Sequence, residues 1–333
     1  MIKNKKQIKL GQFFTKRNVW LKPQVLEFIN YSKMNIIYDP FAGSGDLFNA
    51  FKKGFFKSEV GLDIDKDLKW KYNDSLINIP HIDDAIIITN PPYIKKHSAK
   101  RNGIDLKKYF NSTNYDDIYL LALEKMINAQ KFVVAIVPES FINSNFKDKN
   151  KLYSITILEE NPFFDTETPV CVVCFDGIEK PLSKIKIYKN EEYIDNLEKI
   201  YSHSLPTLKK INVKFNDKKG WLALKAIDGT KENSKIKFDL KENIEYDWEN
   251  KIKTSSRHIT LINLSIQNSM KKRFINKINN ILDNLRKDTN DIILTPFKGN
   301  TKKGERRRRL DFKLARGIIE KAYNELHKEF FNE

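Results

Sequence analysis

The stretch IIYDPFAGSG (residues 36–45) joins a short apolar run to a turn that contains two glycines. Glycine tolerates positive φ and lets the backbone approach a ligand closely, so Gly43 and Gly45 suit a tight turn at the end of a strand. A helix after such a turn would offer unpaired N–H groups to an anion. The same pattern also occurs as a plain connection between elements, so this stretch alone leaves a ligand site and a simple turn both open.

Short β-branched runs alternate with helix-like segments from residue 35 to about residue 176. This alternation is typical of a doubly wound, mostly parallel α/β sheet. Several runs are apolar throughout, as expected of strands that helices cover on both faces. The spacing of Ile118, Leu121 and Met126 predicts a helix over residues 117–129. The predicted strands are Ile36 to Tyr38, Glu59 to Ile64, Ala85 to Thr89, Phe132 to Val137 and Val170 to Phe175.

The composition of the sequence changes after Gly177, where polar, Lys-rich segments are separated by Asp-Gly and Lys-Gly turn signals. This change predicts two domains with a boundary near residue 180. Residues 1–180 would form the α/β domain, and residues 181–333 a smaller basic domain of mixed α and β. Apolar residues four apart between Leu314 and Leu326 predict a helix near the end of the chain.

The net charge of +17 is concentrated in the second part of the chain. Residues 1–179 contain 25 Lys and Arg against 22 Asp and Glu, whereas residues 180–333 contain 35 against 21. A domain this basic suits a partner with a phosphate backbone, because each neutralised phosphate releases condensed counterions. An AT-rich genome also enriches Lys, but RRRR (residues 306–309) uses Arg where such drift would supply Lys. We therefore expect a nucleic acid partner.

Composition also restricts other classes of function. Cys171 and Cys174 lie within a β-branched run, and no further Cys or His pair at metal-ligand spacing accompanies them, so we expect a buried strand and no metal site. The chain contains no run of about 20 apolar residues, and no apolar segment follows its basic start. We therefore expect a soluble, cytoplasmic protein with no membrane partner.

The sequence TNPPY (residues 89–93) follows the predicted strand Ala85 to Thr89. Its two prolines force a stiff, extended turn, which would hold Asn90 and Tyr93 in fixed directions. The N6 lone pair of adenine is delocalised, so this amine has to be positioned against an electrophilic methyl group. The Asn90 side-chain oxygen and the Pro91 carbonyl can accept both amino hydrogens while Tyr93 stacks on the base. A proline-rich strand cap is the structural alternative.

Acidic residues follow the second predicted strand. Asp63 lies at its carboxyl end, where a carboxylate can accept hydrogen bonds from both hydroxyls of a ribose. Asp65, in contrast, suits the start of the next helix. Asp74 lies in a predicted loop, where it would either accept a hydrogen bond from an adenine amino group or belong to an ordinary turn. The order of the glycine turn, Asp63 and the NPPY tetrapeptide favours a cofactor site beside a catalytic one.

These motifs resemble, in kind and in order, those of the gamma-class amino methyltransferases of DNA, the adenine-N6 enzymes of type II restriction-modification systems. LGQFFT (residues 10–15) is similar to the N-terminal cofactor motif of the family, although Lys16 stands where many relatives have Pro. The resemblance covers about the first half of the chain. It implies a Rossmann-like, S-adenosylmethionine-dependent domain that methylates N6 of a flipped-out adenine in double-stranded DNA. It also implies a target-recognition domain and allows a cognate restriction endonuclease encoded nearby.

The resemblance further implies roles for single residues. Thr15 and Gly43 would hold the methionine part of the cofactor and Asp39 its amino group, while Asp63 would bind the ribose and Asp74 the adenine. An aromatic residue of NPFFD (residues 161–165) would sandwich the target base opposite the tyrosine of NPPY, with Phe164 favoured over Phe163. The implied cofactor residues are Phe13, Thr15, Asp39, Gly43, Asp63, Ile64 and Asp74, and the implied catalytic residues are Asn90, Pro91, Pro92, Tyr93 and Phe164.

DNA contacts are expected in the basic second domain. Residues 298–309 combine Lys and Arg with one acidic residue and two glycines, which predicts a flexible loop along the phosphate backbone or, alternatively, a solvated charge run. Base reading is expected at Trp221 and in SSRH (residues 255–258), because Arg can bond guanine in a bidentate manner. The predicted DNA-binding residues are Trp221, Arg257, His258, Lys302, Lys303, Arg306, Arg307, Arg308 and Arg309.

Two other functions fit the same motifs. The NPPY tetrapeptide can orient another planar nitrogen, either adenine in RNA or a glutamine side-chain amide in protein. A catalytically silent DNA-binding module with the same fold is the second alternative. The intact set of Gly43, Asp63, Asn90 and Tyr93 favours an enzyme over such a module.

Overall fold

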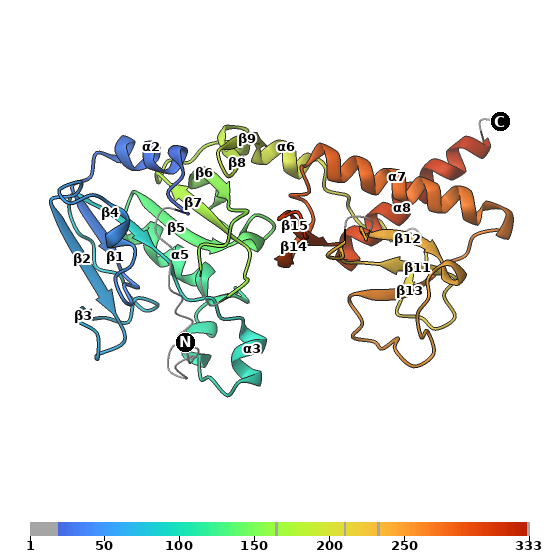
Figure 1. Ribbon diagram of the computed structural model, residues 1–333, viewed down its shortest axis with the longest axis horizontal. Coiled ribbons are helices and arrows are strands. Elements are labelled where there is room, and N and C mark those ends of the chain that lie inside the picture. The colour runs from blue at the N-terminus through green and yellow to red at the C-terminus, as the bar shows by residue number, and fades with distance from the viewer. Residues whose placement is uncertain (1–18, 164–165, 210, 232–233, 332–333) are drawn as a thin grey trace. The chain divides into compact units, whose positions relative to one another are not determined.

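The computed structural model describes residues 19–163, 166–209, 211–231 and 234–331. It divides the chain into two compact units, Met1–Glu198 and Lys199–Glu333 (Figure 1). The predicted boundary near residue 180 therefore lies inside the first unit. The reason is that two short strands, at residues 186–189 and 192–196, join the sheet of the first unit. Their polar composition had suggested that they belong to the second domain.

The first unit is built on a nine-stranded sheet in the order β3-β2-β1-β4-β5-β7-β6-β8-β9. Strands β1 to β5 pair in parallel, and β7 runs antiparallel between β5 and β6. The predicted mostly parallel α/β class is confirmed, and all five predicted strands form to within one residue at each end. The strands are β1 (Ile36–Asp39), β2 (Ser58–Asp63), β3 (Lys71–Tyr72), β4 (Ala85–Thr89), β5 (Val133–Pro138), β6 (Leu152–Ile157), β7 (Val170–Phe175), β8 (Lys186–Lys189) and β9 (Glu192–Asn196).

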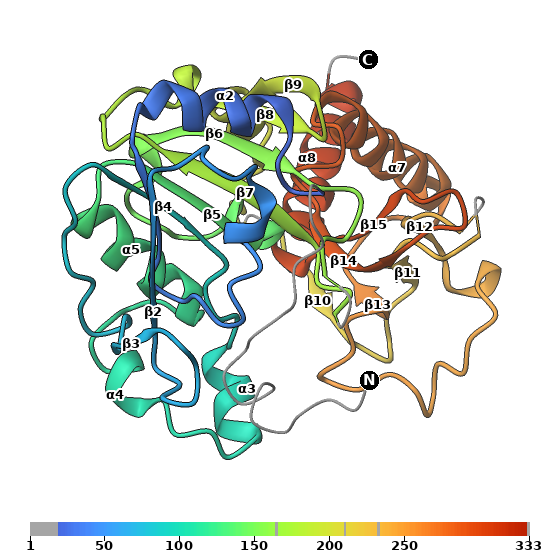
Figure 2. The same ribbon diagram turned by 60° about the vertical axis from the view of Figure 1, so that its left-hand side comes forward.

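Helices of the first unit bury apolar stripes against this sheet. α2 (Pro23–Ser32) packs Val25, Phe28 and Ile29 into one core with alternate residues of β1, β4, β5 and β7. α5 (Ile118–Ala129) packs against β5. Its bounds agree with the helix predicted over residues 117–129. Two short helices, α3 (Lys96–Arg101) and α4 (Lys107–Phe110), follow β4 at the end of the unit remote from α2 (Figure 2).

The segment between β1 and β4 differs from the prediction. Within residues 40–84 no α-helix follows either the glycine turn or β2; the first connection contains only a 3-10 turn at Phe48–Ala50. The Trp70 ring fills the space instead, so close that a Cβ atom on Gly61 would lie 2.3 Å from it and one on Gly45 2.8 Å. The anion-binding helix N-terminus that the turn predicted is therefore absent from this segment, and Asp65 begins no helix.

The second unit combines a four-stranded antiparallel sheet, a two-stranded hairpin and two long helices. α7 and α8 lie against each other and against the sheet (Figure 2), and together they enclose an apolar core. No helix of the described ranges is both long enough and apolar enough to cross a membrane. The elements are α6 (Leu197–Ser202), β10 (Lys214–Phe215), β11 (Leu222–Lys225), β12 (Lys237–Leu240), β13 (Ile259–Asn263), α7 (Lys271–Asp288), β14 (Thr295–Asn300), β15 (Arg306–Arg309) and α8 (Phe312–Phe331).

Candidate active site

The strand order of the first unit reverses between β1 and β4, since the chain builds β2 and β3 on one side of β1 and then places β4 on the other. Ligands of open α/β sheets bind outside the carboxyl ends of the strands at such a switch point. A pocket opens there, and its walls include Pro40, Asp63, Asp74, Asn90 and Pro92. The fold thus brings three motifs that are separate in the sequence to one site.

Asp63 connects the end of β2 to the glycine turn. Its Oδ2 accepts a hydrogen bond from the Gly43 N–H at 2.8 Å, and its Oδ1 accepts one from the Asp65 N–H at 2.8 Å. Burial raises the pKa of Asp63, while these N–H donors partly oppose the shift. A carboxylate has about four lone-pair sites, so Asp63 can shape the turn and still accept ligand hydroxyls in the pocket.

Asp39 is buried beneath the turn and is not among the side chains that line the pocket. Its Oδ1 accepts hydrogen bonds from the Phe41 N–H at 2.9 Å and from the Thr89 hydroxyl at 2.5 Å. Burial raises the pKa of Asp39 to about 7, against the opposing effect of these two bonds. Thr89 therefore supports the site from the end of β4, a role that the sequence did not indicate.

Asp74 lines the pocket. Its Oδ2 accepts hydrogen bonds from Lys108 Nζ at 2.9 Å and from the Tyr109 hydroxyl at 2.8 Å. Its Oδ1 is buried and has no hydrogen-bond partner in the described part of the chain. Leaving a buried acceptor unsatisfied costs about 1–3 kcal/mol, and more when it is charged, so this atom fits a ligand N–H donor. Lys108 and Tyr109 lie 34 and 35 residues away in the sequence, too far for local spacing to reveal.

Asn90 and Tyr93 are joined by a hydrogen bond at the end of β4. The Tyr93 hydroxyl donates to Asn90 Oδ1 and also lies 2.7 Å from the Ile136 carbonyl oxygen of β5. Its ring contacts Phe163 and Tyr119 edge-on, with centroids 6.2 Å apart in both cases. The hydroxyl fixes which way the Asn90 amide faces, and the second lone pair of Oδ1 remains for a substrate N–H.

Three predicted site residues fall where the structure gives no description. Phe13, Thr15 and Phe164 lie outside the described ranges. Phe163, the alternative aromatic, is 3% exposed and packs within the core of the first unit. Ile64 is exposed and lines the pocket beside Asp63.

The arginine run of the second unit does not form the flexible loop that its composition predicted. It is strand β15 of a hairpin, in which Arg306 and Arg308 are buried and Arg307 and Arg309 are partly exposed. A strand points alternate side chains to opposite faces, which accounts for this pattern. Asp228 lies against the run: its carbonyl oxygen accepts a bond from Arg307, and its carboxylate accepts one from the Arg308 backbone N–H.

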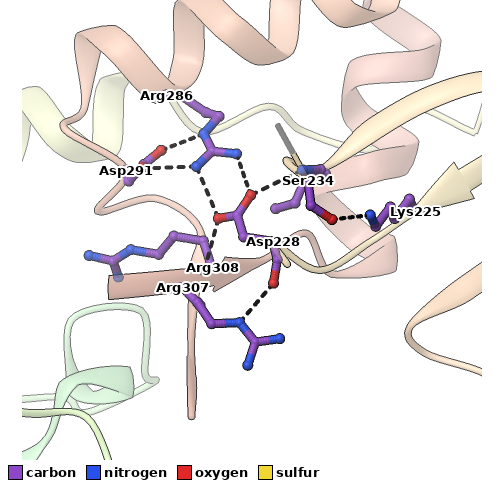
Figure 3. A network of polar contacts seen from close by, with 8 residues as sticks. Lys225, Asp228, Ser234, Arg286, Asp291, Arg307 and Arg308 are labelled. Carbon is purple, nitrogen blue, oxygen red and sulfur yellow. Dashed lines mark hydrogen bonds and ion pairs between the residues drawn. The ribbon is translucent and has the colours of Figure 1, made fainter. Parts of the chain in front are cut away.

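Asp228 holds the hairpin to the rest of the second unit (Figure 3). Its side chain accepts two hydrogen bonds from the Arg286 guanidinium, at 2.9 and 3.0 Å, and one from the Arg308 N–H at 3.0 Å. Its carbonyl oxygen accepts a bond from Arg307 Nε at 2.8 Å, and Asp291 binds the same Arg286. Burial would raise the pKa of Asp228, but the Arg286 bonds and charge outweigh it and the pKa is lowered.

The other predicted DNA-binding residues fall in two kinds of environment. Trp221 packs against the core and donates its N–H to the Leu264 carbonyl at 2.9 Å, a placement that favours packing over base reading. Arg257 is exposed, and exposed His258 meets Phe297 edge-on at 5.7 Å. Arg307 lies over the same Phe297 ring at 5.0 Å, so the fold gathers two predicted residues around an aromatic that was not predicted. Lys302 and Lys303 are exposed between β14 and β15.

The cysteines occupy the predicted strand. Cys171 and Cys174 are both buried and unbonded within β7. Among the described residues, no cluster of three or more His, Cys, Asp or Glu has the arrangement of a metal site. Burial raises the pKa of the Cys174 thiol to about 12, which makes this side chain an inert packing element.

Comparison with known proteins identifies the class. Residues 13–164 match the model of the Eco57I restriction-modification methylase family, so this part of the chain is similar to a restriction-modification methylase domain. The methylase domain identifies S-adenosylmethionine as the cofactor. The Oδ1 of Asp74, buried and without a hydrogen-bond partner among the described residues, suits an N–H donor of such a cofactor.

Parts of the chain are similar to several solved structures. A class I S-adenosylmethionine-dependent methyltransferase from Listeria monocytogenes, described as putative, has 16% identity and a TM-score of 0.37, over 50% of this chain and 65% of its own. A type I restriction-modification methyltransferase subunit from Streptococcus thermophilus has 18% identity and a TM-score of 0.40, over 58% and 53%. The EcoKI M protein has 11% identity and a TM-score of 0.32, over 89% and 67%. No curated protein matches the chain.

Proposed function

We propose that this protein transfers a methyl group from S-adenosylmethionine to N6 of an adenine extruded from double-stranded DNA. The observation that carries the proposal is the shared pocket: Asn90 and Pro92 of the tetrapeptide line the same cavity as Asp63 and Asp74. A cofactor held by the two acidic residues would thus lie beside the groups that orient the amine.

The cofactor supplies an electrophilic methyl group on a sulfonium. Residues of this chain would bind the cofactor and position the target amine. Asp63 would bind the ribose hydroxyls and Asp74 Oδ1 the adenine amino group, while Asp39 would face the amino group of the methionine part. In support of the last role, the buried Asp39 carboxylate bonds the Phe41 N–H, at the start of the segment that carries the glycine turn.

Asn90 and Pro91 would position the target amine. The Asn90 side-chain oxygen and the Pro91 carbonyl would each accept one N6 hydrogen, which aims the nitrogen lone pair at the methyl carbon. The Tyr93 hydroxyl supports this role because it fixes the Asn90 amide. Tyr93 would also contact the flipped base, opposite an aromatic of residues 163–164.

Extruding a base from the duplex costs a few kcal/mol, so contacts with the DNA backbone must offset it. The composition of the second unit suits such contacts, since residues 199–333 contain 31 Lys and Arg against 17 Asp and Glu. We place its DNA-facing surface at Arg257, His258, Lys302, Lys303 and Arg307, together with Phe297. A cognate restriction endonuclease would be a functional partner.

Sequencing of modified adenines in DNA from cells that express the protein tests the proposal directly. N6-methyladenine at one short sequence, absent from cells that express Asn90→Ala, is the expected result. Parallel assays on structured RNA and on protein extracts distinguish the two alternative substrates. Methylation of either of these without methylation of DNA would contradict the proposal.

A further inference from the structure

A second, larger cleft lies next to the tetrapeptide in the first unit. It begins at Lys95, two residues after Tyr93, and runs along α3 and α4. Buried Tyr119, which meets the Tyr93 ring edge-on at 6.2 Å, forms part of its floor. Its volume of about 1320 Å³ exceeds the roughly 300–1,000 Å³ of small-molecule pockets, which indicates an extended ligand.

One wall of this cleft is cationic. Its lining includes Lys95, Lys96, Lys100 and Lys107 together with His97, against Asp105, Asp116 and Asp117. Lys95 is paired with Asp117, at 3.8 Å, but Lys96, Lys100 and Lys107 are exposed and have no acidic partner within the described residues. The remaining acidic groups of the lining are Asp105, which accepts a bond from a backbone N–H of α4, and exposed Asp116.

The opposite wall offers neutral hydrogen-bonding groups and is held in place. Ser140, Asn143, Ser144 and Asn145 line it. Lys149 donates to the carbonyl oxygens of Ile142 and Ser144, at 2.8 and 2.6 Å, and so fixes the backbone on either side of Asn143. Lysine, serine and asparagine side chains are the usual protein contacts to phosphate and sugar groups.

The rings in this cleft do not face its ligand. Phe110 and Tyr119 are 5% and 1% exposed, so neither can stack on a base. A single-stranded binding site that reads or stacks bases needs exposed aromatic faces. Apart from exposed His97, the described lining offers no exposed ring. Cations on one wall and amides on the other, with buried Phe and Tyr rings, indicate a track for the sugar-phosphate backbone.

We propose that this cleft binds the phosphates of the DNA strand that flanks the extruded adenine, with Lys96, Lys100 and Lys107 as the phosphate contacts. The inference rests on the proposed function, since the strand can reach the cleft only when its base enters the adjoining pocket. It places part of the DNA-binding surface in the catalytic unit, apart from the basic second unit.

The test compares two triple variants of the full chain. Lys96→Gln, Lys100→Gln and Lys107→Gln together remove the proposed contacts. Lys52→Gln, Lys53→Gln and Lys57→Gln together make the same charge change at three exposed lysines before the amino end of β2. Binding of a mixed-sequence single-stranded oligonucleotide is measured across a salt series, along with methylation of genomic DNA and affinity for S-adenosylmethionine.

The cleft variant is expected to lose about 2 from the salt slope, at about 0.7 for each single-strand phosphate contact, while the control keeps the wild-type slope. Its KM for DNA should rise, with kcat and cofactor affinity unchanged. A wild-type slope in the cleft variant, or an equal loss in the control, overturns the cleft assignment alone. A wild type that methylates no DNA contradicts the proposed function first, and the cleft assignment falls with it.

Discussion

Replacement of Asp39 by asparagine should remove a pH dependence that the wild type carries. Burial holds the pKa of Asp39 at about 7 in the folded protein, against an ordinary value of 3.8. Because the folded pKa is the higher one, the protonated carboxyl stabilises the fold, and this contribution is lost as pH rises from about 4 to 7. A shift of about three pKa units corresponds to roughly 4 kcal/mol.

The same carboxyl should govern cofactor binding. The positively charged amino group of S-adenosylmethionine favours ionised Asp39, so binding below pH 7 has to release a proton. Affinity should then fall by about tenfold for each pH unit below 7 until the pKa of the complex is reached. Above pH 7 it should be constant. In the Asp39→Asn variant, the amide keeps an oxygen that can accept from Thr89 and Phe41 but cannot titrate.

Calorimetry between pH 5 and 8, in two buffers with different ionisation enthalpies, measures both the affinity and the protons released. Chemical denaturation over the same range measures the free energy of unfolding. Asp63 also has a raised pKa, and the Asp39→Asn variant separates the two groups because only Asp63 remains to titrate. An equal pH dependence in wild type and variant would refute the role of Asp39.

Other perturbations test the remaining parts of the two units. Asn90→Ala should abolish methyl transfer with nearly unchanged cofactor affinity, whereas Asp63→Ala should weaken cofactor binding; near-normal turnover of the first variant would exclude its catalytic role. Tyr93→Phe removes the hydroxyl that fixes Asn90 and should lower the single-turnover rate by roughly 10- to 100-fold. Asp228→Ala leaves the buried Arg286 charge poorly compensated and should cost about 3–5 kcal/mol in urea unfolding, with a smaller loss for Asp291→Ala. Lys302→Ser combined with Lys303→Ser should make the salt slope of duplex binding shallower by about 0.9 for each contact removed, and an unchanged slope would place these lysines away from DNA.

Elements with a repeating apolar pattern could be predicted from the sequence. Strands β1, β4, β5 and β7 are β-branched and nearly or fully buried, so their hydrophobic signal is strong and local. β8 and β9 were assigned to the wrong domain because they lie near the edge of the sheet with few fully buried side chains. Their pairing with β6 is a tertiary effect that composition does not carry.

Some residues of the candidate site could likewise be predicted from the sequence, and others could not. Gly43, Asp63 and Asn90 stand at or shortly after the carboxyl ends of β1, β2 and β4, and strand order brings these ends together. Thr89 and Tyr109 escaped notice because each acts on an acidic residue that is distant in the sequence. The arginine run was predicted as a loop because charged side chains usually face solvent. Asp228, 80 residues earlier in the sequence, instead accepts a hydrogen bond from the Arg308 backbone N–H.

Helix α4 has a place in both binding regions of the first unit. Leu106, just before it, lines the pocket and the cleft, while Lys108 and Tyr109 on the helix itself hold Asp74. A ligand that shifts this short helix therefore alters both sites. Thermodynamic linkage requires such coupling to be reciprocal: the factor by which the cofactor changes the affinity for a strand in the cleft equals the factor by which that strand changes the affinity for the cofactor. Through α4, binding of one substrate would change the affinity of the protein for the other.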